Sequence, residues 1–150
     1  MARWEGKNLR NFAFTVLAIF VILGLCLGRP DYREETRIRN YADPIVAQML
    51  TALSEDNYAE FSEQFDPHLQ AALTEADFHR FSQNIKESYG EYQSHSFYSV
   101  ISYPEVNVVK YIAQFSKVSI GLDVTVEFSS AAGPASVHDF SIVQAGWLTR

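Results

Sequence analysis

The spacing of apolar residues changes at Gly90, and this change constrains the fold more than any other feature of the sequence. Before Gly90, apolar residues recur with a period of about 3.6, as on one face of a helix. After Gly90 the period is about 2, most clearly over residues 119–128, as in a strand with one buried face. Helices followed by strands predict an α+β domain in which the helices pack on one antiparallel sheet.

The first predicted helix has two alternative starts. Asp43 and Pro44 resemble an N-cap followed by proline at the first helical position, which favours a start at residue 43. Ile38, Tyr41 and Ala42 continue the apolar stripe upstream, which favours an earlier start and a bend at Pro44. The sequence leaves both starts open.

Two further helices are predicted before Gly90. A short amphipathic helix over residues 58–65 ends at Pro67, because proline can begin a new turn but cannot extend the helix before it. The next helix begins at Thr74, where the threonine hydroxyl and the Asp77 carboxylate form an approximate capping box. Gly90 closes this helix as a C-cap glycine.

Strands are predicted after Gly90 from alternation and from turn residues. Proline or glycine marks turns at residues 103–105 and 132–134. The predicted strands cover residues 94–103, 106–115, 119–128 and 137–143. Together they form an antiparallel meander of about four strands.

Residues 12–27 are sixteen uncharged residues that can enter a bilayer. As a helix they would measure roughly 24 Å, and they can span a hydrocarbon core of ~30 Å if Arg10 and Arg29 extend toward the headgroups. We therefore expect a transmembrane anchor, with a signal cleaved near Gly28 or a lipid on Cys26 as alternatives. Three basic residues precede the segment and four follow it, so the positive-inside count is nearly tied. Acidic residues interrupt the downstream basic cluster, and we therefore expect the amino terminus inside and the domain extracytoplasmic.

These features predict how the chain is divided. A basic segment covers residues 1–11, the anchor or signal covers 12–28, a juxtamembrane spacer covers 29–42 and one folded domain covers 43–150. A domain of this length is large enough for a single core. The one cysteine, Cys26, lies in the apolar segment, so the domain cannot form an internal disulfide.

The domain is strongly acidic. From Asn40 onward there are five basic residues against fourteen acidic ones, a balance of minus nine. Such a surface repels nucleic acid and anionic headgroups, so neither is expected as a partner of the domain. The acidic residues lack the spacing and the glycine turn of a calcium loop.

Several short motifs accompany this order of elements. They are residues 52–58 (ALSEDNY), Phe65-Asp66-Pro67, Leu73-Thr74-Glu75 and Tyr89-Gly90. Over roughly residues 42–143 the chain resembles the nuclear transport factor 2-like (cystatin-like) superfamily, in particular small prokaryotic members of unknown function behind an anchor or signal. The resemblance implies a cone of about three helices on a curved sheet of about four strands, with a pocket at its open end.

The resemblance leaves the function open. Superfamily members include isomerases, dehydratases and noncatalytic binding or assembly domains, because one fold carries many functions. Dimerisation through the open sheet face is common among such proteins, so the resemblance also implies a homodimer. We expect a membrane-anchored extracytoplasmic domain that binds a small ligand, a protein partner or another copy of itself.

Two histidines are candidate site residues because each is in phase with apolar residues of its predicted strand. A neutral imidazole at His95 or His138 can act as a general base, while Tyr98 or Tyr103 polarises a carbonyl. Tyr103 is in phase with His95. Asp139 is expected on the face opposite to His138 unless a bulge intervenes. The alternative is that each histidine is only hydrogen-bonded in or beside the core.

Other chemistry has little support in the sequence. His68 and His79 have no ligand partner at metal spacing, and neither an HExxH motif nor a cysteine pair is present. The chain also lacks a nucleophile elbow, a phosphate loop and a dinucleotide fingerprint. We therefore expect no metal and no cofactor. A noncatalytic role is favoured, and an isomerase or dehydratase with a histidine base is the alternative.

Overall fold

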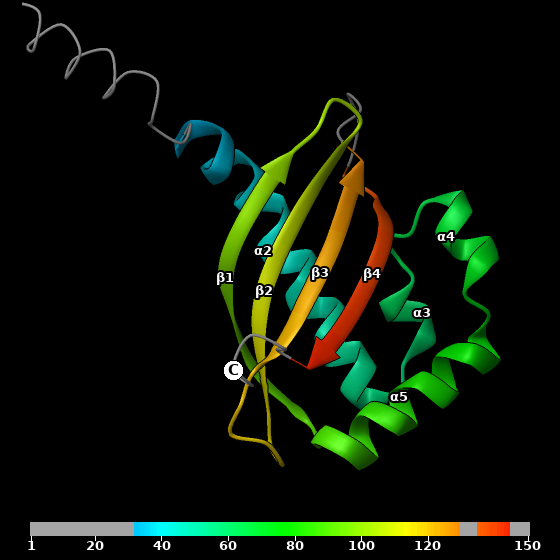
Figure 1. The fold of residues 1–150 in the computed structure, drawn as a ribbon. Helices are drawn as coiled ribbons and strands as arrows, with labels where there is room; N and C mark the ends of the chain where they lie inside the picture. Colours follow the sequence, from blue (N-terminus) through cyan, green and yellow to red (C-terminus); the bar gives the residue numbers. More distant parts are fainter. Residues whose placement is uncertain (1–31, 130–134, 145–150) are drawn as a thin grey trace, which may run out of the picture. The chain divides into compact units, whose positions relative to one another are not determined.

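The computed structural model describes residues 32–129 and 135–144 (Figure 1). Within these residues, helices come first and strands follow, so the predicted α+β class with four antiparallel strands is confirmed. The described helices number four instead of about three, because the turn after Pro67 is a helix of its own. The elements are α2 (Tyr32–Glu55), α3 (Tyr58–Phe61), α4 (Pro67–Ala72), α5 (Glu75–Tyr89), β1 (Tyr92–Ser102), β2 (Val106–Phe115), β3 (Leu122–Ser129) and β4 (Val137–Gln144).

Helix α2 decides between the two predicted starts. It runs from Tyr32 to Glu55 with Pro44 inside it, so the upstream start is the one found. Ile38 and Ala42 are fully buried, which means that part of the predicted spacer belongs to the core. A compact unit begins at Thr36.

The predicted anchor at residues 12–28, the basic segment at 1–11 and the turn at 132–134 lie outside the described residues. Among the residues that the structure does describe, no helix is both long enough and apolar enough to cross a membrane.

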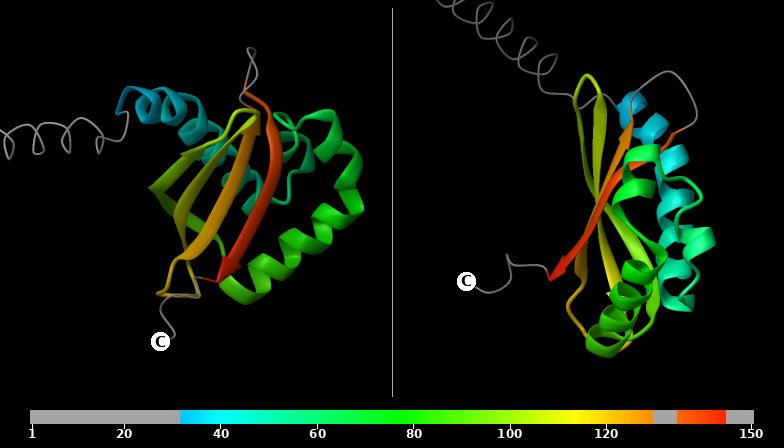
Figure 2. Two further views of the ribbon diagram at one scale, coloured as in Figure 1. Left: turned by 45° about the horizontal axis from the view of Figure 1, so that its top comes forward. Right: turned by 90° about the vertical axis from the view of Figure 1, so that its right-hand side faces the viewer.

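The sheet is a meander in the order β1-β2-β3-β4, with each strand antiparallel to the next. Figure 2 shows the helices gathered on one face of this sheet. Alternate residues of the central strands β2 and β3 are buried. The alternation that predicted the third strand is real, although β3 begins at Leu122 and Ile120 lies exposed in the turn before it. The buried residues of β2 and β3 are Val109, Tyr111, Ala113, Phe115, Leu122, Val124, Val126 and Phe128.

Aromatic side chains fill the space between the helices and the sheet. Phe61 and Phe78 from the helices lie 4.7 Å apart between ring centroids, and Tyr111, Phe115 and Phe128 enter from the sheet, all fully or almost fully buried. In the described part of the chain, only Ser82 and Asn107 are buried polar residues. Their side chains donate to the Leu53 carbonyl and to the Tyr41 hydroxyl, respectively.

The predicted ends of α5 are confirmed. Thr74 is the N-cap, and its hydroxyl accepts a hydrogen bond from the Asp77 amide. Gly90 ends the helix with a φ of 88°, a conformation that a side chain would strain. A Cβ at Gly90 would also stand 2.2 Å from the Ser116 Oγ.

Strand β1 has a bulge at Tyr98 that corrects one prediction. Phe97 pairs with Tyr111 and Ser99 pairs with Lys110, so Tyr98 is the extra residue. Residues after the bulge exchange faces, and Tyr103 is therefore exposed instead of sharing the face of His95. The prediction from uninterrupted parity was wrong because a bulge adds one residue to the period.

Candidate functional site

The segment before α4 is joined to the edge of β4. The Val137 amide donates to the Gln64 carbonyl at 2.7 Å, and the Asp66 amide donates to the Val137 carbonyl at 2.9 Å. Phe65 thereby forms a parallel bridge with Val137. This pairing fixes the backbone of Asp66 beside the start of β4.

His138 is turned outward by a bulge in β4. Phe128 pairs with Val137 and Glu127 pairs with Asp139, so His138 is the extra residue. Val137 points into the core, and the His138 side chain is 48 % exposed. The prediction that His138 shares the face of the apolar residues of its strand was wrong for this reason.

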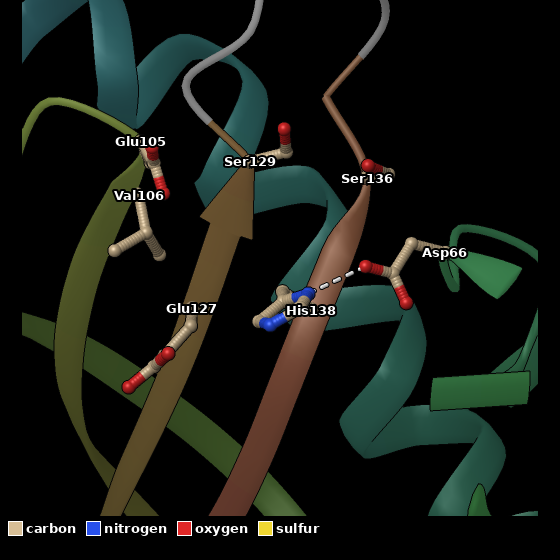
Figure 3. Close-up of a pocket in the computed structure, with 7 residues that line it drawn as sticks. All are labelled: Asp66, Glu105, Val106, Glu127, Ser129, Ser136 and His138. Atoms are coloured by element: carbon tan, nitrogen blue, oxygen red, sulfur yellow. Dashed lines mark hydrogen bonds and ion pairs between the residues drawn. The ribbon is translucent and has the colours of Figure 1, made fainter. Parts of the chain in front are cut away.

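Asp66 holds two partners at once. Its Oδ1 accepts the Leu69 amide at 2.8 Å, which makes Asp66 the N-cap of α4. Its Oδ2 lies 2.6 Å from the His138 Nδ1 (Figure 3). Burial alone would raise the pKa of Asp66, but the hydrogen bonds from Leu69 and His138 outweigh it and lower the pKa. The same contact with Asp66 raises the pKa of His138.

An open pocket of about 410 Å³ lies beside this pair (Figure 3). Val106, Glu127 and Ser129 alternate with buried residues of β2 and β3, so the pocket is on the face of the sheet opposite to the helices. Three carboxylates, one imidazole and two hydroxyls give it an acidic, hydrogen-bonding wall. The lining residues are Asp66, Glu105, Val106, Glu127, Ser129, Ser136 and His138.

His68 joins the pair from the first turn of α4. Its ring stacks on the ring of His138, with centroids 5.2 Å apart and planes inclined by 22°. One ligand atom each from Asp66, His68 and His138 lies within 4.8 Å of the others. Sequence spacing gave no sign of this cluster, because its members come from a helix start and from a strand far along the chain.

His95 occupies a different environment on β1. It is half-buried, its Nδ1 lies 2.7 Å from the Tyr92 hydroxyl, and its ring meets the Tyr111 ring edge-on at 5.2 Å. Burial lowers the pKa of His95. The buried Tyr111 donates to the Asp43 Oδ1 at 2.8 Å, and burial raises the pKa of this tyrosine.

The structure does not bring the four predicted site residues together. His95 and His138 lie on the two opposite edge strands of the sheet (Figure 1). Tyr98 and Tyr103 are 63 % and 52 % exposed, whereas His95 faces Tyr111. Asp66 and His138 do meet, although nothing in the sequence predicted their contact.

The sequence pattern described as "Protein of unknown function (DUF3887)" matches residues 46–129, which is 84 of the 150 residues. The chain belongs to the DUF3887 family. The part that matches the family includes Asp66 and His68 and ends before His138. No curated protein matches this DUF3887 chain.

Three solved structures are similar to this DUF3887 chain. Bd1075 of Bdellovibrio bacteriovorus has 10 % identity and a TM-score of 0.47; the match covers 75 % of this chain but only 42 % of Bd1075. AclR of Streptomyces galilaeus has 11 % identity and a TM-score of 0.44, with coverage of 72 % and 82 %. RPA3114 of Rhodopseudomonas palustris, a SEC-C motif containing protein, has 14 % identity and a TM-score of 0.41, with coverage of 71 % and 92 %. Similarity at this level says nothing about function.

Proposed function

We propose that this DUF3887 chain is a membrane-tethered, noncatalytic domain that binds a cationic ligand in the pocket beside β4. The observation that carries the proposal is the wall of the pocket, where Asp66, Glu105 and Glu127 surround an open space of about 410 Å³. Carboxylates attract cations. The compact unit from Thr36 onward has seven basic residues against fourteen acidic ones, and this balance of minus seven adds a long-range field that also attracts cations.

We further propose that the domain is a variant of the nuclear transport factor 2-like fold. The support is the order of elements, with helices first and then a four-stranded meander that they cover on one face. In this variant the ligand site lies on the outer face of the sheet. Large aromatic side chains such as Tyr111 and Phe128 occupy the inner face.

The enzymatic alternative has one observation in its favour. Asp66 holds the His138 Nδ1, an arrangement that can orient an imidazole as a general base. An isomerase or dehydratase that removes a proton builds negative charge on its substrate, and such charge needs donors or cations nearby. Glu105 and Glu127 would instead repel it, so binding of a cation is the better-supported function.

The proposal is tested by mapping backbone amide shifts of the full chain in detergent micelles during titration with a panel of cations. The panel contains 1,4-diaminobutane, Mg²⁺ and Zn²⁺, with acetate as the anionic comparison. We expect at least one cation to shift the amides of Glu127, Ser129 and Ser136. Glu127→Gln should weaken that binding several-fold, because it removes a wall charge.

Asp123→Asn is the matched control, since Asp123 lies on the same face of β3 but does not line the pocket. It should bind like the wild type. Shifts that gather around His95 and Tyr111, or acetate binding without cation binding, would refute the proposed site.

The tether proposal rests on residues 12–27 of the sequence, with the domain on the outside of the cell membrane. External protease should digest the domain in intact cells and leave an amino-terminal fragment with the membrane. Domain released into the medium with a new amino terminus near residue 29 would favour the cleaved signal. Domain protected in intact cells and digested only after permeabilisation would reverse the orientation.

A further inference from the structure

We propose that Asp66, His68 and His138 form a binding site for a divalent transition metal, with Zn²⁺ as the best-matched ion. This inference rests on the proposed function, because it names the class of cation held at one wall of the same pocket. Two imidazoles and one carboxylate are a ligand set that zinc accepts, with further positions left to water or another ligand. Mg²⁺ and Ca²⁺ prefer oxygen ligands, so they fit this set less well.

The distances are close to those that a zinc site needs. One ligand atom from each of the three residues already lies within 4.8 Å of the others. Zinc bonds of about 2.0–2.2 Å place tetrahedral ligand atoms roughly 3.3 Å apart. His68 is exposed on the first turn of α4, so its side chain can rotate. Such a rotation can bring its ring nitrogen roughly 1–1.5 Å closer to the other two ligand atoms.

The other two ligands are held by the backbone. Hydrogen bonds between the segment of Asp66 and Val137 tie this acid to the strand that carries His138. The Leu69 amide binds Asp66 Oδ1, which orients the carboxylate and leaves Oδ2 directed at His138. Partners that orient a ligand in this way strengthen metal sites. A bound ion would take the place of the proton that Asp66 and His138 share.

The bulge in β4 is essential to the site. Without the extra residue at position 138, the imidazole would not be directed to the edge where Asp66 and His68 lie. The stacking of His68 on His138 shows that both rings reach the same place. Glu127 and Asp139 add negative charge around His138.

The inference is tested by Zn²⁺ titration of the full chain in micelles against a competing fluorescent chelator. We expect one high-affinity zinc ion per chain. His68→Ala and His138→Ala should each lower zinc affinity at least ~10-fold. Loss of a residue that only orients a metal ligand already lowers affinity by about 10-fold or more, and these two residues are ligands themselves. His68 is exposed and does not line the pocket, so His68→Ala should keep the fold and the pocket.

His79→Ala is the matched control, because His79 also lies between two carboxylates, those of Asp56 and Glu75, but outside the proposed site. It should bind zinc like the wild type. Undiminished zinc binding by His68→Ala would overturn the inference, and so would loss of zinc binding only in His79→Ala.

A parallel titration with 1,4-diaminobutane separates this inference from the proposed function. If the diamine shifts the Glu127 and Ser129 amides of the wild type while zinc does not bind, the metal site fails and the cation pocket stands. If neither the diamine nor any metal ion shifts these amides, both proposals fail together. Zinc binding that depends on His68, with or without diamine binding, supports the metal site.

Discussion

The two edge strands of the sheet each carry a histidine near a bulge, yet the histidines have opposite environments. In β1, irregularities at Gln93 and Tyr98 stand on either side of His95, so His95 itself keeps its place against the buried Tyr111. In β4 the bulge falls on His138, which turns outward to Asp66. The position of the extra residue relative to the histidine therefore decides whether the imidazole packs in the fold or faces a ligand.

The two environments also differ in energetic terms. Contacts around His95 and Tyr111 are half-buried or buried, where an unpaired polar group is costly. The His138 contact is at an exposed position, where an ion pair adds about 0–1 kcal/mol. We thus interpret the β1 edge as structural and the β4 edge as available for binding.

Tyr111→Phe should have the largest effect. The substitution removes a hydrogen bond from a fully buried hydroxyl to the Asp43 carboxylate, and such bonds contribute about 1.5–3 kcal/mol. Urea denaturation should show that loss in the free energy of unfolding. Tyr98→Phe on the exposed bulge is the control and should change it by less than ~0.5 kcal/mol. Equal effects from the two variants would contradict a structural role for the buried contacts beside His95, to which Tyr111 of β2 belongs.

His95→Gln should have an intermediate effect of about 1 kcal/mol, because the Tyr92 hydroxyl loses its imidazole partner in a half-buried site. A double-mutant cycle with Tyr92→Phe isolates the contact. The coupling energy should be of the same order as the single-variant loss. If the loss in the double variant equals the sum of the two single-variant losses, the contact between the two side chains contributes nothing to stability.

Histidine titration by NMR should separate two positions. Burial lowers the pKa of His95 from its ordinary value of 6.5, whereas the hydrogen bond to Asp56 raises the pKa of His79 above it. The His95 contribution to stability therefore declines as the pH falls from 6.5 toward the lowered pKa of the folded state. The His79 contribution is fully present below 6.5 and is lost as the pH rises through the raised pKa of the folded state.

This pH behaviour can be measured by thermal unfolding from pH 5 to 8. His95→Gln should flatten the acid side of the profile relative to the wild type. His79→Gln should lower stability more at pH 5.5 than at pH 8. A steeper acid side for His95→Gln, or a greater loss at pH 8 than at pH 5.5 for His79→Gln, would mean that the environments of the two rings have been assigned wrongly.

His138→Gln should have the smallest effect on folding. The lost contact with Asp66 is at an exposed imidazole, so the free energy of unfolding without added metal should fall by no more than ~1 kcal/mol. Urea denaturation in the presence of a chelator measures this value. A loss above ~2 kcal/mol would make the β4 edge as structural as the β1 edge.

Much of the fold followed from local sequence. The change of period at Gly90 predicted the α+β class, and Thr74 and Gly90 marked the ends of α5, because caps and turn residues act within a few positions. Strand β3 was predicted from alternation, since a central strand must bury one face, and β2 was predicted from a less regular apolar pattern after the turn at residues 103–105. The face of β1 beyond its bulge and the direction of His138 at the bulge of β4 were predicted wrongly, whereas Phe140 and Ile142 face the core as predicted.

The sequence by itself therefore determined the helices and strands apart from the start of α2, that the domain is acidic and that residues 12–27 are apolar. Only the tertiary structure decided that Asp66, His68 and His138 meet. A bulge is set by how one strand pairs with its neighbour, and the Asp66 segment reaches β4 through backbone hydrogen bonds between residues far apart in the chain. Neither the bulge nor these hydrogen bonds can be predicted from nearby residues. Both depend on backbone N–H and C=O groups, which nearly every residue type carries.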